Sequence, residues 1–232
     1  MKKYLFICIL GFSFILPACT DEEITNFFYV KTITVSGKTL NLSNIEEPEA
    51  SIEGIYISPG NSLNPVVTSD NNGDFSLQLL EDDSFYLRAT KSGFVSVNTA
   101  RRSLSDDETG IEIKMPTETE TQDVINSAFV FAPQLVNHAW LLVDTVNTAG
   151  EEVIGQSVVL SAAPSAAAYL DCDGSDSGLN ETTGAPCPAD RSGPMYITYF
   201  DTAGEIDISV GNESQTASIK MGEITRLEFE LQ

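Results

Sequence analysis

Hydrophobic and polar residues alternate with a period of two along most of the chain after residue 28, which predicts half-buried β-strands. Clusters of Gly, Pro, Asn and Asp separate these segments at intervals of about 8–12 residues, a spacing typical of β-sandwiches. The pattern therefore predicts an all-β fold. We expect strands over residues 29–42, 51–58, 66–69, 75–80, 85–90, 95–99, 110–115, 140–146, 153–160, 195–200, 205–210, 215–220 and 225–231.

The alternation is interrupted at residues 117–135. Residues 117–121 alternate Thr and Glu and indicate a polar linker, and the apolar residues that follow match one face of a short helix. Thr121 would be the N-cap of this helix and Pro133 its end. The β-branched residues in the segment leave a strand open as the alternative.

The second half of the chain resembles the first half in pattern. Residues 199–208 and residues 67–76 both contain a strand, a Gly turn, an acidic residue and a second strand. Each segment is preceded by a strand that carries a glycine, Gly54 in one and Gly155 in the other. We interpret the second half as a degenerate copy of the first sandwich, and generic β-patterning is the competing interpretation.

The N-terminus has the pattern of an export signal. Lys2 and Lys3 precede an almost wholly apolar stretch at residues 4–16, which would span only about 20 Å as a helix. That length is too short for a hydrocarbon core of about 30 Å and indicates a signal sequence.

Leu16-Pro17-Ala18-Cys19 follows the apolar stretch and resembles the bacterial lipobox. The resemblance implies cleavage before Cys19 and acyl chains on this cysteine, and two or more chains give stable membrane anchoring. The alternative is an ordinary signal peptide with a chance cysteine.

The acidic residues 21–23 after the cysteine resemble the surface-export signals of Bacteroidetes lipoproteins, although they would also suit a solvated tether. We expect a cell-envelope protein at the outer membrane, on either the periplasmic or the outer face of that membrane.

Four motifs follow one another within residues 31–115. They are Val-Ser-Gly at 35–37, Ile-Glu-Gly-Ile-Tyr-Ile at 52–57, Thr-Ser-Asp-Asn-Asn-Gly-Asp-Phe-Ser-Leu at 68–77, and Tyr-Leu-Arg-Ala-Thr-Lys-Ser-Gly-Phe at 86–94. In this order they resemble the carboxypeptidase regulatory-like, or transthyretin-like, β-sandwich family. The resemblance implies a seven-stranded sandwich that supports a catalytic or transport partner and does no chemistry itself.

These patterns predict two tandem transthyretin-like or Ig-like sandwiches behind a lipoprotein signal. The predicted segments are a signal peptide at 1–18, a lipidated tether at 19–28, the carboxypeptidase regulatory-like sandwich at 29–116, a linker at 117–135 and a second, degenerate sandwich at 136–232.

The formal net charge of −22 narrows the classes of partner. Two of the twelve Lys and Arg lie in the signal segment, and the rest are scattered along the chain. Nucleic-acid binding needs a basic patch that neutralises phosphates, so this charge excludes nucleic acid as a partner. It suits solubility, cationic partners or divalent ions.

Cys172 and Cys187 are the two cysteines of the mature chain besides Cys19, because Cys8 lies in the signal segment. They are fifteen residues apart, and in an exported protein such a pair predicts one disulfide. In the chain-entropy model, closing this loop would stabilise the fold by roughly 3 kcal/mol. A zinc site would need further soft ligands, and the sole histidine, His138, is distant in sequence.

Acidic residues in the same loop raise the question of calcium. Asp171, Asp173 and Asp176 supply the hard oxygen ligands that calcium prefers, but a solvated acidic loop is the competing hypothesis. No other cofactor is expected. The segment from Asp70 to Asp74 poses the same question, and there Asn-Gly favours a tight turn instead.

Residue types for catalysis are sparse. His138 is the only imidazole for a Ser–His–Asp arrangement, and the chain contains no Gly-x-Ser-x-Gly turn. A surface or capping role is the better prediction for His138, and alternation places Trp140 in the core. A hydrolase site made of two carboxylates in a cleft is the remaining catalytic alternative.

The sequence thus predicts a non-enzymatic, membrane-anchored binding or scaffold module. Its partners would be the lipid membrane through Cys19, and an envelope protein or glycan through the sandwich loops. The first alternative is a glycan-binding accessory lipoprotein of an uptake or hydrolase system. A paired-carboxylate hydrolase is the second.

Overall fold

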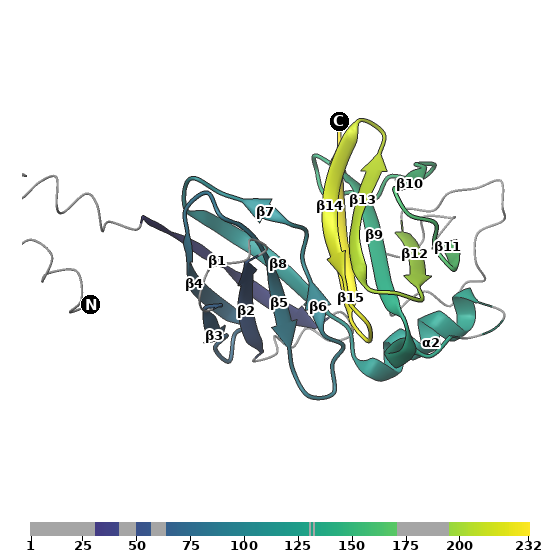
Figure 1. Cartoon of the computed structure of the whole chain (residues 1–232), viewed down its shortest axis with the longest axis horizontal. Helices are drawn as coiled ribbons and strands as arrows, with labels where there is room; N and C mark the ends of the chain where they lie inside the picture. The colour runs from purple at the N-terminus through teal and green to yellow at the C-terminus, as the bar shows by residue number, and fades with distance from the viewer. Residues whose placement is uncertain (1–30, 42–49, 57–63, 130, 132, 171–194) are drawn as a thin grey trace, which may run out of the picture. The chain divides into compact units, whose positions relative to one another are not determined.

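The computed structural model describes residues 31–41, 50–56, 64–129, 131, 133–170 and 195–232. Residues Thr32–Gln232 form one compact unit, distinct from Met1–Lys31. Strands dominate this unit, and one α-helix lies between its two halves in the sequence (Figure 1). Within the described residues, the structure contains no helix with the length and hydrophobicity that a membrane crossing requires.

The described residues of the first half form eight strands. They are β1 (Thr32–Asn41), β2 (Ser51–Tyr56), β3 (Val66–Thr68), β4 (Asp74–Leu80), β5 (Ser84–Thr90), β6 (Val97–Asn98), β7 (Arg102–Ser103) and β8 (Glu108–Met115). Strands β4, β1 and β8 form a three-stranded sheet in which β1 and β8 are parallel. The other five strands belong to a larger sheet.

The linker and the second half follow. They contain α2 (Glu118–Ala128), the 3-10 helix η1 (Leu135–Asn137), β9 (Ala139–Asn147), β10 (Val158–Leu160), β11 (Ala166–Leu170), β12 (Met195–Phe200), β13 (Gly204–Val210), β14 (Glu213–Ile219) and β15 (Ile224–Leu231). Strands β10, β13 and β14 form a second three-stranded sheet. The all-β prediction is confirmed.

One nine-stranded sheet runs through both halves, in the order β11-β12-β9-β15-β6-β5-β2-β3, with β7 paired to β5. The halves meet where β15 pairs in parallel with β6, Ile224 beside Val97 and Thr225 beside Asn98. Backbone pairing therefore continues across the junction, and the two halves share a sheet.

The two halves repeat the same strand topology. The first and last strands are parallel neighbours in each half, β1 with β8 and β9 with β15. Strand β4 pairs antiparallel with β1, and β12 pairs antiparallel with β9. The antiparallel pair of β2 with β5 in the first half corresponds to the pair of β10 with β13 in the second. The third strand differs, because β3 pairs with β2 whereas β11 pairs with β12.

The strand pairings match the two halves differently from the sequence pattern, which matched residues 67–76 with residues 199–208. Residues 67–76 span β3 and β4, but residues 199–208 span β12 and β13, the equivalents of β4 and β5. The sequence pattern therefore matched each strand of the first half with the equivalent of the next strand along the chain. Tight Gly turns of similar composition occur at more than one corner of a sandwich, so they do not identify which corner is which.

Three hydrophobic clusters hold the layers together. The first fills the space between β4-β1-β8 and the large sheet, and the third lies between the large sheet and β10-β13-β14. The second packs α2 and η1 onto the opposite face of β9 and β12. Strand β9 is thus buried on both faces, which explains its unbroken apolar run Ala-Trp-Leu-Leu-Val at residues 139–143.

The helix is present, but it begins four residues earlier than predicted. Thr117 is the N-cap, and its hydroxyl and the Glu120 carboxylate form a capping box. The prediction of Thr121 as N-cap was wrong: its hydroxyl donates to the Thr117 carbonyl within the first turn. The Thr-Glu segment taken for a linker is therefore the first turn of the helix.

Gly155 explains a further departure from the predicted strands, and Gly37 marks an irregularity within β1. Gly155 has a φ of +88°, so the predicted strand 153–160 is reduced to Val158–Leu160. Gly37 lies at a register shift between β1 and β8, where a Cβ atom would stand 1.9 Å from the Ile111 carbonyl oxygen. The short strands β7 and β11 were not predicted.

Candidate functional site

The principal predicted site residues lie outside the described residues. This holds for the lipidation residue, for both cysteines of the predicted disulfide and for the three aspartates of the calcium hypothesis: Cys19, Cys172, Cys187, Asp171, Asp173 and Asp176. Acylation, the disulfide and calcium binding therefore remain predictions. Among the described residues, no group of three or more His, Cys, Asp or Glu side chains is placed to hold a metal ion.

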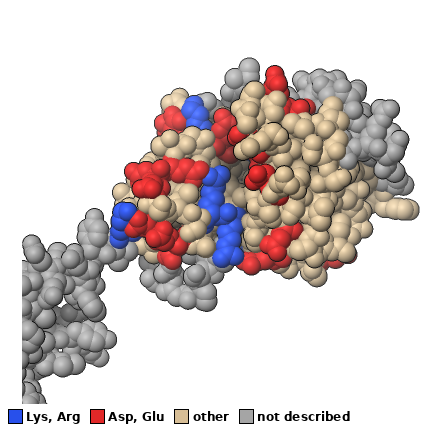
Figure 2. Space-filling model, turned by 90° about the horizontal axis from the view of Figure 1, so that it is seen from above, with Lys and Arg blue, Asp and Glu red and all other residues tan. Residues whose placement is uncertain are grey.

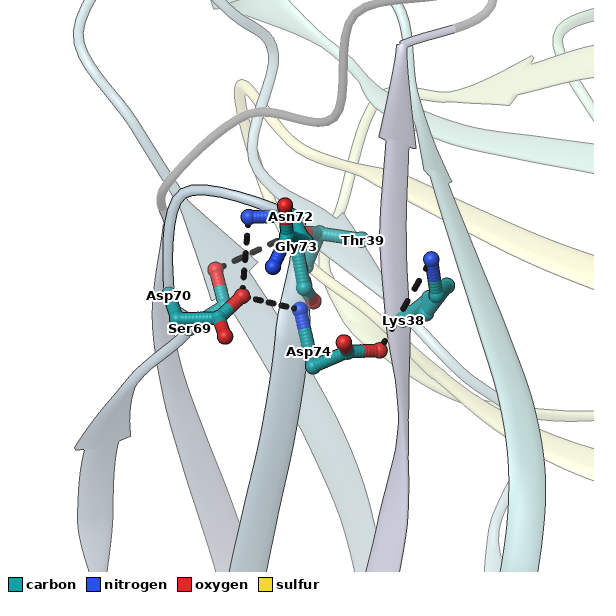
Figure 3. Close-up of polar contacts among 7 residues, drawn as sticks. All are labelled: Lys38, Thr39, Ser69, Asp70, Asn72, Gly73 and Asp74. Carbon is teal, nitrogen blue, oxygen red and sulfur yellow. Dashed lines mark hydrogen bonds and ion pairs between the residues drawn. The ribbon is translucent and has the colours of Figure 1, made fainter.

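The turn that begins at Asp70 is described in full (Figure 3). The Oδ1 atom of Asp70 accepts hydrogen bonds from the backbone N–H groups of Asn72 at 2.8 Å and Asp74 at 2.9 Å. Gly73 has a φ of +77°, and Asp74 lies 3.8 Å from Lys38 Nζ. The prediction of a tight turn here is confirmed, because the Asp70 carboxylate binds its own backbone.

His138 contacts a carboxylate and aromatic rings. Its Nδ1 atom lies 3.1 Å from Asp201 Oδ1, and Ser165 donates to the other oxygen of Asp201 at 2.8 Å. In a nucleophilic triad the imidazole lies between the hydroxyl and the carboxylate, whereas here the carboxylate lies between the other two. The His138 ring also packs on Tyr199, with centroids 4.7 Å apart. This arrangement ties the start of β9 to the end of β12.

Trp140 is 1% exposed and belongs to the core beneath α2. Its indole N–H donates to the Leu135 carbonyl at 3.0 Å, so its single polar atom is satisfied. The rings of Phe129 and Tyr199 lie 6.0 Å and 5.2 Å from it. The prediction of a core role is confirmed.

An ionic network crosses the junction of the two halves. Glu223, which precedes β15, is 8% exposed. One carboxylate oxygen is paired with Arg88 of β5, and the other accepts from Asn98 Nδ2 of β6 at 2.9 Å. Arg88 Nη1 also lies 4.0 Å from Glu53 of β2. A charge buried between two halves requires such partners, so the network fixes how β15 meets β6.

Backbone hydrogen bonds hold the residues around Glu223. The Ile224 N–H donates to the Ser96 carbonyl at 3.0 Å across the junction, and the Trp140 N–H donates to the Glu223 carbonyl at 3.2 Å within the second half. Sequence analysis did not identify Glu223. Its partner Arg88 is 135 residues away, and no periodic pattern indicates a carboxylate whose burial depends on another half of the chain.

A groove of about 400 Å³ lies beside this junction, between the edge strand β8 and strands β14 and β15. Arg102, Lys114 and Arg226 line it, and each is paired with an acidic residue. Arg226 Nε donates to Asp144 at 2.7 Å. Figure 2 shows Lys and Arg side chains gathered in a band with acidic residues beside them. This junction groove is thus a mixed-charge surface.

Burial shifts the pKa of the Tyr196 phenol. Burial beside the Tyr169 ring, whose centroid is 4.9 Å away, raises the pKa of Tyr196 from 10.0 to about 12. The cause is desolvation, which penalises the phenolate. A phenol with this pKa stays neutral at physiological pH and acts as a core residue.

Comparisons with known proteins find no matching family model and no matching curated protein. Several solved structures are similar in part. The Bacillus anthracis TIE protein has a TM-score of 0.28 at 9% identity over 86% of this chain, which spans 34% of that chain. The shaft pilin SpaA from Lactobacillus rhamnosus GG has a TM-score of 0.27 at 9% identity, covering 85% of this chain and 97% of the pilin.

A DUF3823 family protein from Parabacteroides merdae has a TM-score of 0.28 at 8% identity, covering 82% of this chain and 98% of that protein. Scores this low carry no conclusion about function.

Proposed function

We propose that the chain is a non-enzymatic, membrane-anchored module of the cell envelope that holds two β-sandwich halves as one rigid body for binding or scaffolding. The observation that carries the proposal is the junction, where the large sheet continues through β6 and β15 and Glu223 is buried against Arg88 and Asn98. Domains joined by a flexible linker move independently, whereas a shared sheet and a buried ion pair oppose such motion.

The linker helix supports the same proposal. Helix α2 buries Val124, Ile125 and Ala128 against β9 and β12. Gln122 accepts from the Leu135 N–H at 3.3 Å and donates to the Pro133 carbonyl at 3.4 Å, so the chain after the helix is held as well. The segment between the halves is therefore part of the packed body.

Anchoring comes from the predicted acylation of Cys19. The compact unit begins at Thr32, so a short segment would separate the lipid from the folded body. A rigid body on a short tether keeps its binding surfaces near the bilayer, which suits a module that holds or orients a partner. The predicted location is the outer membrane.

The glycan-binding alternative receives less support from the described residues. Trp140, Tyr199 and Phe129 pack against one another under α2, and Tyr196 packs against Tyr169. Rings that are used in the core cannot stack on a sugar. These packed rings therefore provide no platform for stacking on a sugar, whereas Phe131 is 93% exposed.

The proposal can be tested with the full chain and its Cys19→Ser variant expressed in a Gram-negative host. We expect the unaltered chain in the detergent-extracted membrane fraction, and formaldehyde should trap it with a second envelope protein. The variant should be found in the soluble fraction without this complex. Equal fractionation of both chains would contradict the anchor, and turnover of envelope polysaccharides by the purified chain would contradict the non-enzymatic role.

A further inference from the structure

A second groove, of about 730 Å³, lies along α2 on the side that faces the loop before β6. We call it the helix groove. One wall is the polar flank of α2, with Glu118 and Asp123, and the other wall is apolar, with Phe94, Leu135 and Val136. From this groove we infer a docking site for a basic segment of a partner protein that carries apolar side chains.

The groove is built from fixed parts. Gln122 lines it and clamps the turn at Pro133 and Leu135 through the two hydrogen bonds described above. The Glu118 N–H donates to the Gly93 carbonyl at 3.2 Å, which holds the first turn of α2 against the loop before β6. A groove with fixed walls binds a ligand without first ordering its own backbone.

The charge of the groove selects the chemistry of its occupant. Glu118 and Asp123 are exposed, and no Lys or Arg is among the described residues that line the groove. In a chain of net charge −22, this wall attracts cations. Lys91 Nζ lies 5.8 Å from the centroid of the Phe94 ring, so the chain's own cation occupies this part of the rim and the attraction comes from the carboxylates of α2.

The apolar wall extends beyond the groove. Val136 is 68% exposed and Met221 is 42% exposed. Val136 and Gly222 both line the groove, and Met221 precedes Gly222 in the sequence. Exposed apolar side chains beside carboxylates match an amphipathic basic segment, whose apolar groups would cover this rim while its cations face α2.

The inference deepens the binding part of the proposed function and rests on it, but its test does not depend on membrane anchoring. The probe is a dansyl-labelled peptide of alternating Lys and Leu, added to the purified full chain in neutral detergent. We expect saturable binding that weakens with salt. The same peptide with Glu in place of Lys should not bind.

Variants of the chain then locate the site. Glu118→Gln combined with Asp123→Asn should weaken binding about tenfold, as expected for the loss of two exposed ion pairs. Val136→Ser, at an exposed position, should weaken it further without loss of folding. The matched control is Glu213→Gln with Glu230→Gln, which removes the same charge from exposed sites outside the groove.

Three outcomes would overturn the inference: equal weakening in the control, equal binding of the acidic peptide, or no binding of the basic peptide. Binding of maltohexaose that is lost in the groove variants would instead identify a glycan site. None of these outcomes alters the membrane fractionation of the chain, so failure here is separate from failure of the proposed function.

Discussion

The junction of the two halves gives the sharpest prediction, through Glu223→Gln. This change removes a charge that is 8% exposed and paired with Arg88, and it keeps the shape of the side chain. Removal of one partner from a buried ion pair costs about 3–5 kcal/mol. The Arg88 side chain is 30% exposed, so water screens part of this loss. We expect the free energy of unfolding to fall by about 2–3 kcal/mol.

Urea denaturation of the full chain in detergent, followed by tryptophan fluorescence, measures this change. The single tryptophan lies under α2, in the half that contains Glu223. The matched control is Glu53→Gln, whose carboxylate lies 4.0 Å from Arg88 with both side chains 30% exposed. Such a pair contributes less than about 1 kcal/mol. A loss for Glu223→Gln no larger than that of the control would refute the buried network.

Three further predictions concern the turns and the core. Gly37→Ala would place Cβ 1.9 Å from the Ile111 carbonyl oxygen, so we expect the free energy of unfolding in urea to fall by more than about 3 kcal/mol. Gly204→Ala is unhindered and should cost under about 1 kcal/mol; equal losses would contradict the close approach of β1 to β8 at Gly37. Asp70→Ala removes two hydrogen bonds to backbone N–H groups and should cost about 1–2 kcal/mol in the same assay, and an unchanged midpoint would contradict the turn. The pKa of Tyr196 is about 12 in the folded chain and near 10 in the unfolded chain. The contribution of its neutral phenol to the free energy of unfolding is therefore complete below pH 10 and is lost as pH rises to about 12. This loss amounts to about 3 kcal/mol, and it should be absent from pH-dependent urea curves of Tyr196→Phe; identical pH dependence in both chains would contradict the burial of the phenol.

The strands could be predicted because their signal is local. Strand β4 alternates buried and exposed residues, and the Asp-Asn-Asn-Gly-Asp turn before it binds its own backbone. Period-two patterns and turn residues need no information from the rest of the chain. The core position of Trp140 followed from the same rule.

The junction could not be predicted from the sequence because it joins distant residues. Arg88 and Glu223 are each unremarkable in their local sequence, and only the pairing of β6 with β15 brings them together. Strand β6 is two residues long, too short for a periodic signal. The start of α2 was missed for a different reason, because its alternating Thr and Glu residues resemble a linker until the capping box at Thr117 is recognised.

The rigidity of the junction can be measured as a distance between the two halves. Nitroxides attached through non-cysteine chemistry at Ser76 on β4 and Glu213 on β14, both exposed, would report on the two outer sheets while Cys172 and Cys187 stay untouched. For the full chain in detergent, we expect one narrow distance distribution that broadens in Glu223→Gln. A broad or two-peaked distribution in the unaltered chain would show that the halves move independently, which is incompatible with a rigid junction.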